Sequence, residues 1–209
     1  MASEIEISNK GVQILEKCYT TALRGLPTSE SADVLARDYL LKNNENVHKS
    51  ANKLINAQIA KCATTGFVTG LGGLITLPIT LPADVAGNLY VQIRMIASLA
   101  VMGGYSPYDD EVKTMIYMTL VGMTVEDVIK ITGIKVGNKL ALQAVKQIPR
   151  QVIGKINQKV GFRLMTRFGE KGIINLSKLV PVAGGGIGAI FDGITTKIIA
   201  SRAKKTFIG

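Results

Sequence analysis

The sequence predicts an all-α protein with a single helical domain. In most segments the apolar residues recur every three or four positions, and no run alternates with the period of two that is typical of a half-buried strand. Hydrophobic residues make up 47% and charged residues 19%, which is too apolar for a disordered chain. Its 209 residues suit one sizeable domain. We expect a helical N-terminal extension at 1–49 and the main helical domain at 50–209.

Three helices are expected before residue 64. Helical spacing from Val12 onward predicts the first over 3–24, and a break follows at Leu26–Ser29. A second helix follows Ser31. After a polar turn at 43–46, the spacing of leucine and isoleucine predicts the third over Val47–Ala63.

An apolar tract follows. No charged residue occurs in the 22 residues from Cys62 to Ala83. Between Cys62 and Tyr108 the only charged residues are Asp84 and Arg94. The tract is long enough to span a bilayer, but its glycines and two prolines weaken a spanning helix. We therefore expect a closely packed apolar helical hairpin, either buried or lying shallowly in a membrane.

Helix-start patterns locate the later helices. Ser106 is expected as an N-cap, with Pro107 in the first turn and the helix running to Gly122. Another helix is expected over Glu126–Ala144. A further one begins at Pro149, and its apolar face holds Val152, Ile153, Ile156, Val160, Leu164 and Phe168. The final helix is expected over about 184–206.

Small residues at four-residue spacing predict close helix packing. The segment from Gly184 to Ala189 also matches a dinucleotide-binding fingerprint, but no acid follows about 20 residues later, as that fold requires. The packing interpretation is favoured, with one glycine face in the apolar tract and one in the last helix. The glycines concerned are Gly66, Gly70, Gly184, Gly185, Gly188 and Gly193.

The sequence offers little for catalysis, and we predict no catalytic residue, cofactor or metal site. His48 is the only histidine, which removes most zinc sites and most histidine-based mechanisms, and we expect it to be solvated. Cys18 and Cys62 are expected to be buried and structural. No phosphate-binding loop motif is present.

Three isolated charges are candidate buried polar residues: Asp84, Arg94 and Asp192. Charges in apolar segments must be paired, exposed or functional. Ten helical residues separate Asp84 from Arg94 by about 15 Å, so they cannot pair with each other. We favour structural ion pairs with other partners, and a hydrolase that uses Asp84 or Asp192 is an alternative.

The charge is unevenly distributed. The net charge is −3 for residues 1–129 and +13 for residues 130–209. Such asymmetry indicates an anionic partner. Five cations at four-residue spacing form a basic stripe, which is a candidate lipid-binding site: Lys155, Lys159, Arg163, Arg167 and Lys171. Each cation near an anionic bilayer contributes about 1 kcal/mol to binding. Nucleic acid is a less favoured partner, because no binding motif accompanies the charge.

Seven segments, spread over residues 50–207, resemble the EcsC protein family in the family's order: Thr65–Gly70, Leu81–Ala86, Tyr90–Ala97, Lys159–Leu164, Phe168–Gly172, Leu179–Gly185 and Phe191–Asp192. That family is broadly distributed in bacteria and has no well-established enzymatic activity. The resemblance implies a helical, membrane-associated protein and supplies no catalytic residues.

We therefore expect a non-catalytic, peripheral membrane-associated protein. It would dock through its basic C-terminal region and apolar glycine-rich segments. No secretory signal is expected, so the protein would lie at the cytoplasmic, inner face of a bacterial membrane. The expected partner is an anionic lipid surface, and a membrane protein is a further candidate partner. A membrane-inserting pore-forming or effector-type module is the alternative.

Overall fold

The computed structural model describes residues 3–62, 83–124, 127–128, 130, 149–168 and 186–209, with the backbone alone for 83–84, 167–168 and 186–192. In this part of the chain the regular elements are all helices, so the prediction of an all-α single domain is confirmed. They are α1 (Glu4–Arg24), α2 (Ala32–Leu41), α3 (Val47–Cys62), α4 (Ala83–Met102), α5 (Asp110–Val121), α8 (Arg150–Phe168) and α10 (Gly186–Phe207).

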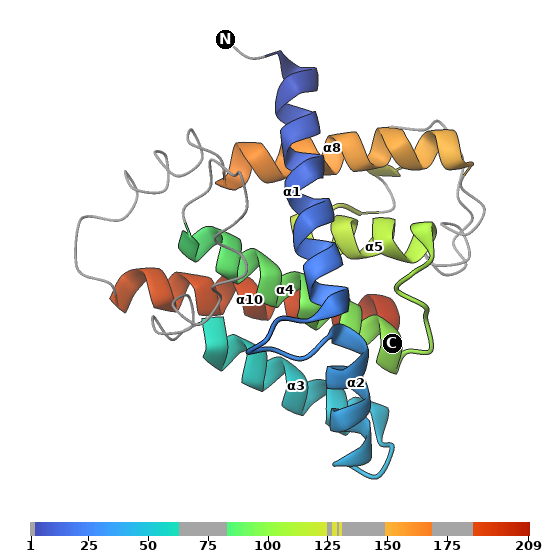
Figure 1. The fold of residues 1–209 in the computed structure, drawn as a ribbon, viewed down its shortest axis with the longest axis vertical. Helices are drawn as coiled ribbons and strands as arrows, with labels where there is room; N and C mark the ends of the chain where they lie inside the picture. Colours follow the sequence, from blue (N-terminus) through green and yellow to red (C-terminus); the bar gives the residue numbers. More distant parts are fainter. Residues whose placement is uncertain (1–2, 63–82, 125–126, 129, 131–148, 169–185) are drawn as a thin grey trace.

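Helix α4 lies at the centre of the fold (Figure 1). It packs against α1, α2, α3, α5 and α10, whereas α8 packs against α1 and α5. Among the described residues, Val85–Met102 is the one stretch long and apolar enough to cross a membrane, yet 83% of it is buried within the protein. A helix enclosed in this way is typical of a protein core. Helices α1 and α2, from the expected N-terminal extension, contribute side chains to the same core.

The helix ends follow from local sequence. The Oγ atoms of Ser3 and Ser31 accept the backbone N–H groups of Glu6 and Val34, which caps α1 and α2. Gly122 ends α5 with a φ of 69°, a left-handed conformation that glycine adopts without strain.

The predicted start of α5 is wrong. The helix begins at Asp110, after Asp109, and not at Pro107. Ser106 instead accepts the backbone N–H of Tyr108 at 3.3 Å, within a turn. The carbonyl of Pro107 accepts the hydroxyl of Tyr19, and this contact with α1 holds the turn outside the helix.

A glycine contact joins α1 and α8. A Cβ atom on Gly11 would overlap the carbonyl of Gly161, and one on Gly161 would overlap the backbone of α1 at Ser8 and Val12. The two backbones can therefore touch only because neither position carries a side chain. This contact was not predicted, since the two glycines lie far apart in the sequence. Of the glycines that were predicted to pack, Gly188 and Gly193 lie in α10, and Gly66, Gly70, Gly184 and Gly185 lie outside the described residues.

Candidate functional site

Four residues of the predicted basic stripe belong to α8, where acidic residues accompany part of it, and Lys171 lies outside the described residues. Lys155 and Lys159 are exposed, and the Nζ atom of Lys159 lies 3.9 Å from a carboxylate oxygen of Glu4 on α1. Arg163 donates two hydrogen bonds to Asp127, at 2.9 and 3.1 Å. Arg163 is therefore committed to a contact within the protein. The side chains of Arg167 and Lys171 lie outside what the structure describes.

Asp127 is held from two directions. Its carboxylate also accepts the backbone N–H of Thr124 at 3.0 Å, and its own N–H donates to the Thr124 hydroxyl at 3.3 Å. The bond from Arg163, followed by the bond from Thr124, lowers the pKa of Asp127 below its usual value. Both bonds favour the ionised form, so the pair is intact at neutral pH.

A second basic surface is formed by α3 and α10, which pack against each other. We call it the α3–α10 face. Its exposed residues recur every three or four positions on each helix, so each set forms one side of its helix. They are His48, Lys49, Asn52, Lys53, Asn56 and Ala60 on α3, and Ile194, Lys197, Ile198, Ser201, Arg202 and Lys205 on α10.

Cations dominate this face. The two helices together contain seven Lys and Arg residues and a single acid, Asp192. In the described part of the chain, Lys49, Lys53, Lys197 and Lys205 form no ion pair. The amine of Lys204 donates to the side-chain oxygen of Asn52 at 2.8 Å and links the two helices. As far as the described residues show, these four lysines are thus available to an external anion.

Two large apolar side chains lie among these cations. Ile194 is 55% exposed and Ile198 is 49% exposed. The opposite side of α10 fixes this orientation, because Ile199 and Ala203 are buried and Thr196 accepts a 3.0 Å hydrogen bond from Gln92 of α4. The exposure of both isoleucines is therefore set by the packing of the helix.

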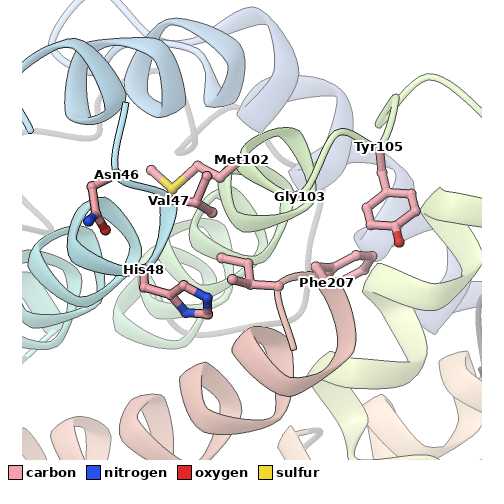
Figure 2. A pocket seen from close by; sticks show the side chains of 8 residues that line it. Asn46, Val47, His48, Met102, Gly103, Tyr105 and Phe207 are labelled. Carbon is pink, nitrogen blue, oxygen red and sulfur yellow. The ribbon is translucent and has the colours of Figure 1, made fainter. Parts of the chain in front are cut away.

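A hollow of about 570 Å³ lies where α3 begins and α4 and α10 end. Figure 2 shows the side chains that line it. Asn46 and His48 lie at one side and Tyr105 at the other, with Phe207 between them (Figure 2). The remaining lining residues are Val47, Met102, Gly103 and Ile208. No lining residue is a carboxylate or thiol, so His48, which is exposed, has neither of these groups as a partner among the residues that line the hollow.

Other groups that could carry chemistry are already engaged or buried. Burial raises the pKa of the Cys18 thiol to about 12, which keeps it protonated. Lys113 pairs with Glu16 at 2.6 Å beside a second hollow of about 330 Å³. Within the described residues no group of three His, Cys, Asp or Glu side chains could hold a metal ion. The side chains of Asp84 and Asp192 lie outside the described part, although both residues belong to helices.

Arg94 lies in the middle of α4 and is only 1% exposed. Its guanidinium donates to the hydroxyl of Ser29, to the backbone carbonyl of Glu30 at 3.2 Å and to the side-chain oxygen of Gln58 at 3.0 Å. It also lies over the ring of Tyr90, with 5.4 Å from its carbon to the ring centre. An ion pair was expected here, but these acceptors are neutral. Arg94 thus ties α4 to α3 and to the connection between α1 and α2.

Comparison with protein-family models, with curated proteins and with solved structures finds no match to this chain. The resemblance to the EcsC family therefore stays a prediction.

Proposed function

We propose that the protein binds peripherally to an anionic membrane through the α3–α10 face. The observation that carries the proposal is the exposure of Ile194 and Ile198 on α10, together with four exposed lysines of α3 and α10 that form no ion pair among the described residues. Basic faces that also present aliphatic side chains suit the boundary between lipid headgroups and acyl chains. The binding would be on the cytoplasmic side of a bacterial membrane, as expected from the sequence.

Both kinds of side chain contribute to the binding free energy. Each cation near an anionic surface contributes about 1 kcal/mol, and full burial of an isoleucine side chain about 1.5–3 kcal/mol. Duplex nucleic acid would use the cations, but exposed aliphatic residues would gain little from a phosphate backbone. The combination therefore favours lipid over nucleic acid.

The alternative functions have less support. A pore-forming module needs a segment that leaves the fold, and the apolar helix α4 is instead enclosed by five others. No structural observation supports a hydrolase that uses Asp84 or Asp192, because the side chains of both residues lie outside the described part. The hollow beside His48 has no carboxylate among its lining residues, and in the second hollow the carboxylate of Glu16 pairs with Lys113.

The test is sedimentation of the full chain with vesicles of phosphatidylglycerol and phosphatidylcholine, against pure phosphatidylcholine. We expect preference for the anionic vesicles and release by salt. The double variant Lys197→Gln/Lys205→Gln should bind about 30-fold more weakly, from about 1 kcal/mol for each charge. Ile194→Ser/Ile198→Ser should weaken binding by about tenfold or more.

The matched control is Lys155→Gln/Lys159→Gln, which removes two lysines from α8 and should change binding little. Two outcomes would overturn the proposal. One is an equal loss of affinity from the control and from the α10 variant. The other is tight binding to duplex DNA that the isoleucine substitutions leave unchanged, with no preference for anionic vesicles.

A further inference from the structure

The hollow between the start of α3 and the ends of α4 and α10 adjoins the α3–α10 face. His48 belongs to both, since it lines the hollow and is one of the exposed residues of the face. On the α10 side, the exposed Lys205 stands two residues before Phe207, which also lines the hollow. A membrane bound at this face would therefore lie next to the hollow.

The buried residues that line the hollow are apolar, and the exposed ones are polar. Met102 and Phe207 are 5% and 3% exposed, and the ring of Tyr105 packs edge-on against that of Phe207, with 5.9 Å between their centres. Asn46 and His48 are exposed and lie at one side of the hollow, with Tyr105 at the other (Figure 2). The hollow is thus apolar in its depth and polar at its edge.

The polar side chains at this edge can all donate hydrogen bonds. In the described part of the chain, the imidazole of His48 and the hydroxyl of Tyr105 form no hydrogen bond or ion pair. The side-chain oxygen of Asn46 accepts the backbone N–H of Lys49 at 2.9 Å, which leaves the amide nitrogen of Asn46 to donate. Because no carboxylate lines the hollow, these donors suit an anion.

The charges near the hollow are mostly positive. Lys49 follows His48 in α3, and a 2.8 Å hydrogen bond to Asn52 holds Lys204 of α10 close to the same end of α3. The lining residues of α4 and of the turn after it are uncharged. Glu45, in the turn before α3, forms no ion pair with any residue that the structure describes. The cations of both helices therefore favour an anion at the hollow.

We propose that the hollow is a binding site for the phosphate headgroup of a single anionic phospholipid. His48, Asn46 and Tyr105 donate to the phosphate oxygens, and the apolar depth of the hollow receives the carbon atoms next to them. The volume of about 570 Å³ lies within the range of small-molecule sites, about 300–1,000 Å³. This inference rests on the proposed membrane function and adds selectivity to it. The α3–α10 face attracts any anionic surface, whereas the hollow selects a phosphate headgroup.

The first measurement separates a contact inside the hollow from attraction to charge alone. Tyr105→Phe keeps the net charge and the ring that packs on Phe207, and it removes one donor. We expect this variant to bind phosphatidylglycerol vesicles about tenfold more weakly, the usual loss of a hydrogen bond to a charged group. Tyr108→Phe is the matched control, because the hydroxyl of Tyr108 bonds Asp33 and the residue does not line this hollow. The control should bind as the unmodified protein does.

The second measurement uses the pH dependence of vesicle binding. Histidine is the side chain whose charge ordinarily changes between about pH 5 and pH 8, whereas the phosphodiester of phosphatidylglycerol stays ionised there. The unmodified protein should bind about fivefold more tightly at about pH 5 than at about pH 8, from about 1 kcal/mol for one added cation. His48→Gln should remove this difference. Lys53→Gln, on the exposed side of the same helix, should weaken binding at both pH values and keep the ratio.

A third measurement identifies the source of the phosphate group. Short-chain phosphatidylglycerol and inorganic phosphate are each added as competitors of vesicle binding, at constant ionic strength. The short-chain lipid should displace the protein at the lower concentration, because only the lipid also fills the apolar depth of the hollow.

Any of three results overturns the inference. Tyr105→Phe binds vesicles as tightly as Tyr108→Phe, His48→Gln keeps the pH difference, or inorganic phosphate competes as well as the short-chain lipid. In each case the preference for anionic vesicles and the loss from Lys197→Gln/Lys205→Gln would remain, so the proposed membrane function would stand. Failure of the unmodified protein to bind anionic vesicles would instead overturn both proposals.

Discussion

Helices α8 and α10 are both rich in lysine and arginine, but their surroundings differ. On α8, Arg163 is bound to Asp127, and Lys159 lies near Glu4. On α10, Lys197 and Lys205 form no ion pair within the described residues, and the neighbouring α3 adds further cations without an acid. The two surfaces also lie apart, with α8 near one end of the view in Figure 1 and α3 near the other. A high content of lysine and arginine therefore does not by itself identify a binding surface. Whether these cations are available to a ligand depends on the acidic residues that the fold places next to them.

The largest expected effect concerns how firmly α8 is held inside the protein. Gly161→Ala places a Cβ atom into the backbone of α1, so we expect a loss of about 1–3 kcal/mol in the free energy of unfolding. Gly154→Ala, on the same helix, meets no atom within 4 Å and should stabilise by about 0.5–1 kcal/mol. Urea unfolding measures both. Equal effects of the two substitutions would show that α1 and α8 are not in backbone contact.

The next prediction compares one cation from each surface. Arg163→Glu removes two hydrogen bonds and sets two carboxylates side by side, so it should cost about 1 kcal/mol of stability. Lys205→Glu on α10 should change stability by less than about 0.5 kcal/mol, because the lysine has no ion-pair partner in the described chain. Thermal unfolding checks both. A larger loss from Lys205→Glu would reverse the comparison.

The ion pair on the α8 side also predicts a pH dependence. The pKa of Asp127 is lowered in the folded protein, so its contribution to stability is present above its usual pKa of about 4 and is lost as the pH falls through the lower folded value. Asp127→Asn should therefore be less stable than the unmodified protein at neutral pH, by less than about 1 kcal/mol. This difference should shrink below pH 4. A difference that stays constant down to pH 2 would mean that the carboxylate charge plays no part.

Much of the fold could be predicted from the sequence because helices are local. The spacing of Ile153, Ile156, Val160 and Leu164 predicts the buried side of α8, and the structure buries all four. The start of α5 could not be predicted, because Pro107 is held by Tyr19, 88 residues away. A local capping pattern cannot include such a contact.

The candidate surface depends on still longer-range contacts. Counting charge along the chain assigned Lys49 and Lys53 to a mildly acidic half, whereas the fold places them beside α10. The spacing of cations along the chain likewise predicted that Arg163 belongs to a lipid-binding stripe, whereas in the fold Arg163 forms an ion pair with Asp127. A regular helical pattern shows which side of a helix a residue occupies, but not which element covers that side. The neutral acceptors of Arg94 escaped prediction for the same reason.

The smallest expected effect tests whether α8 can still act as a lipid-binding surface. Glu4 and Lys159 are 68% and 44% exposed in their side chains and lie 3.9 Å apart, so Glu4→Gln should leave the melting temperature within experimental error. The substitution removes the acid next to the stripe and raises the net charge by one. If the membrane meets the α3–α10 face, which lies away from Glu4, affinity for anionic vesicles should rise by less than about twofold, since screening weakens charges beyond about 10 Å. A rise of about fivefold, the effect of a full cation at the surface, would show that α8 is the side that meets the lipid.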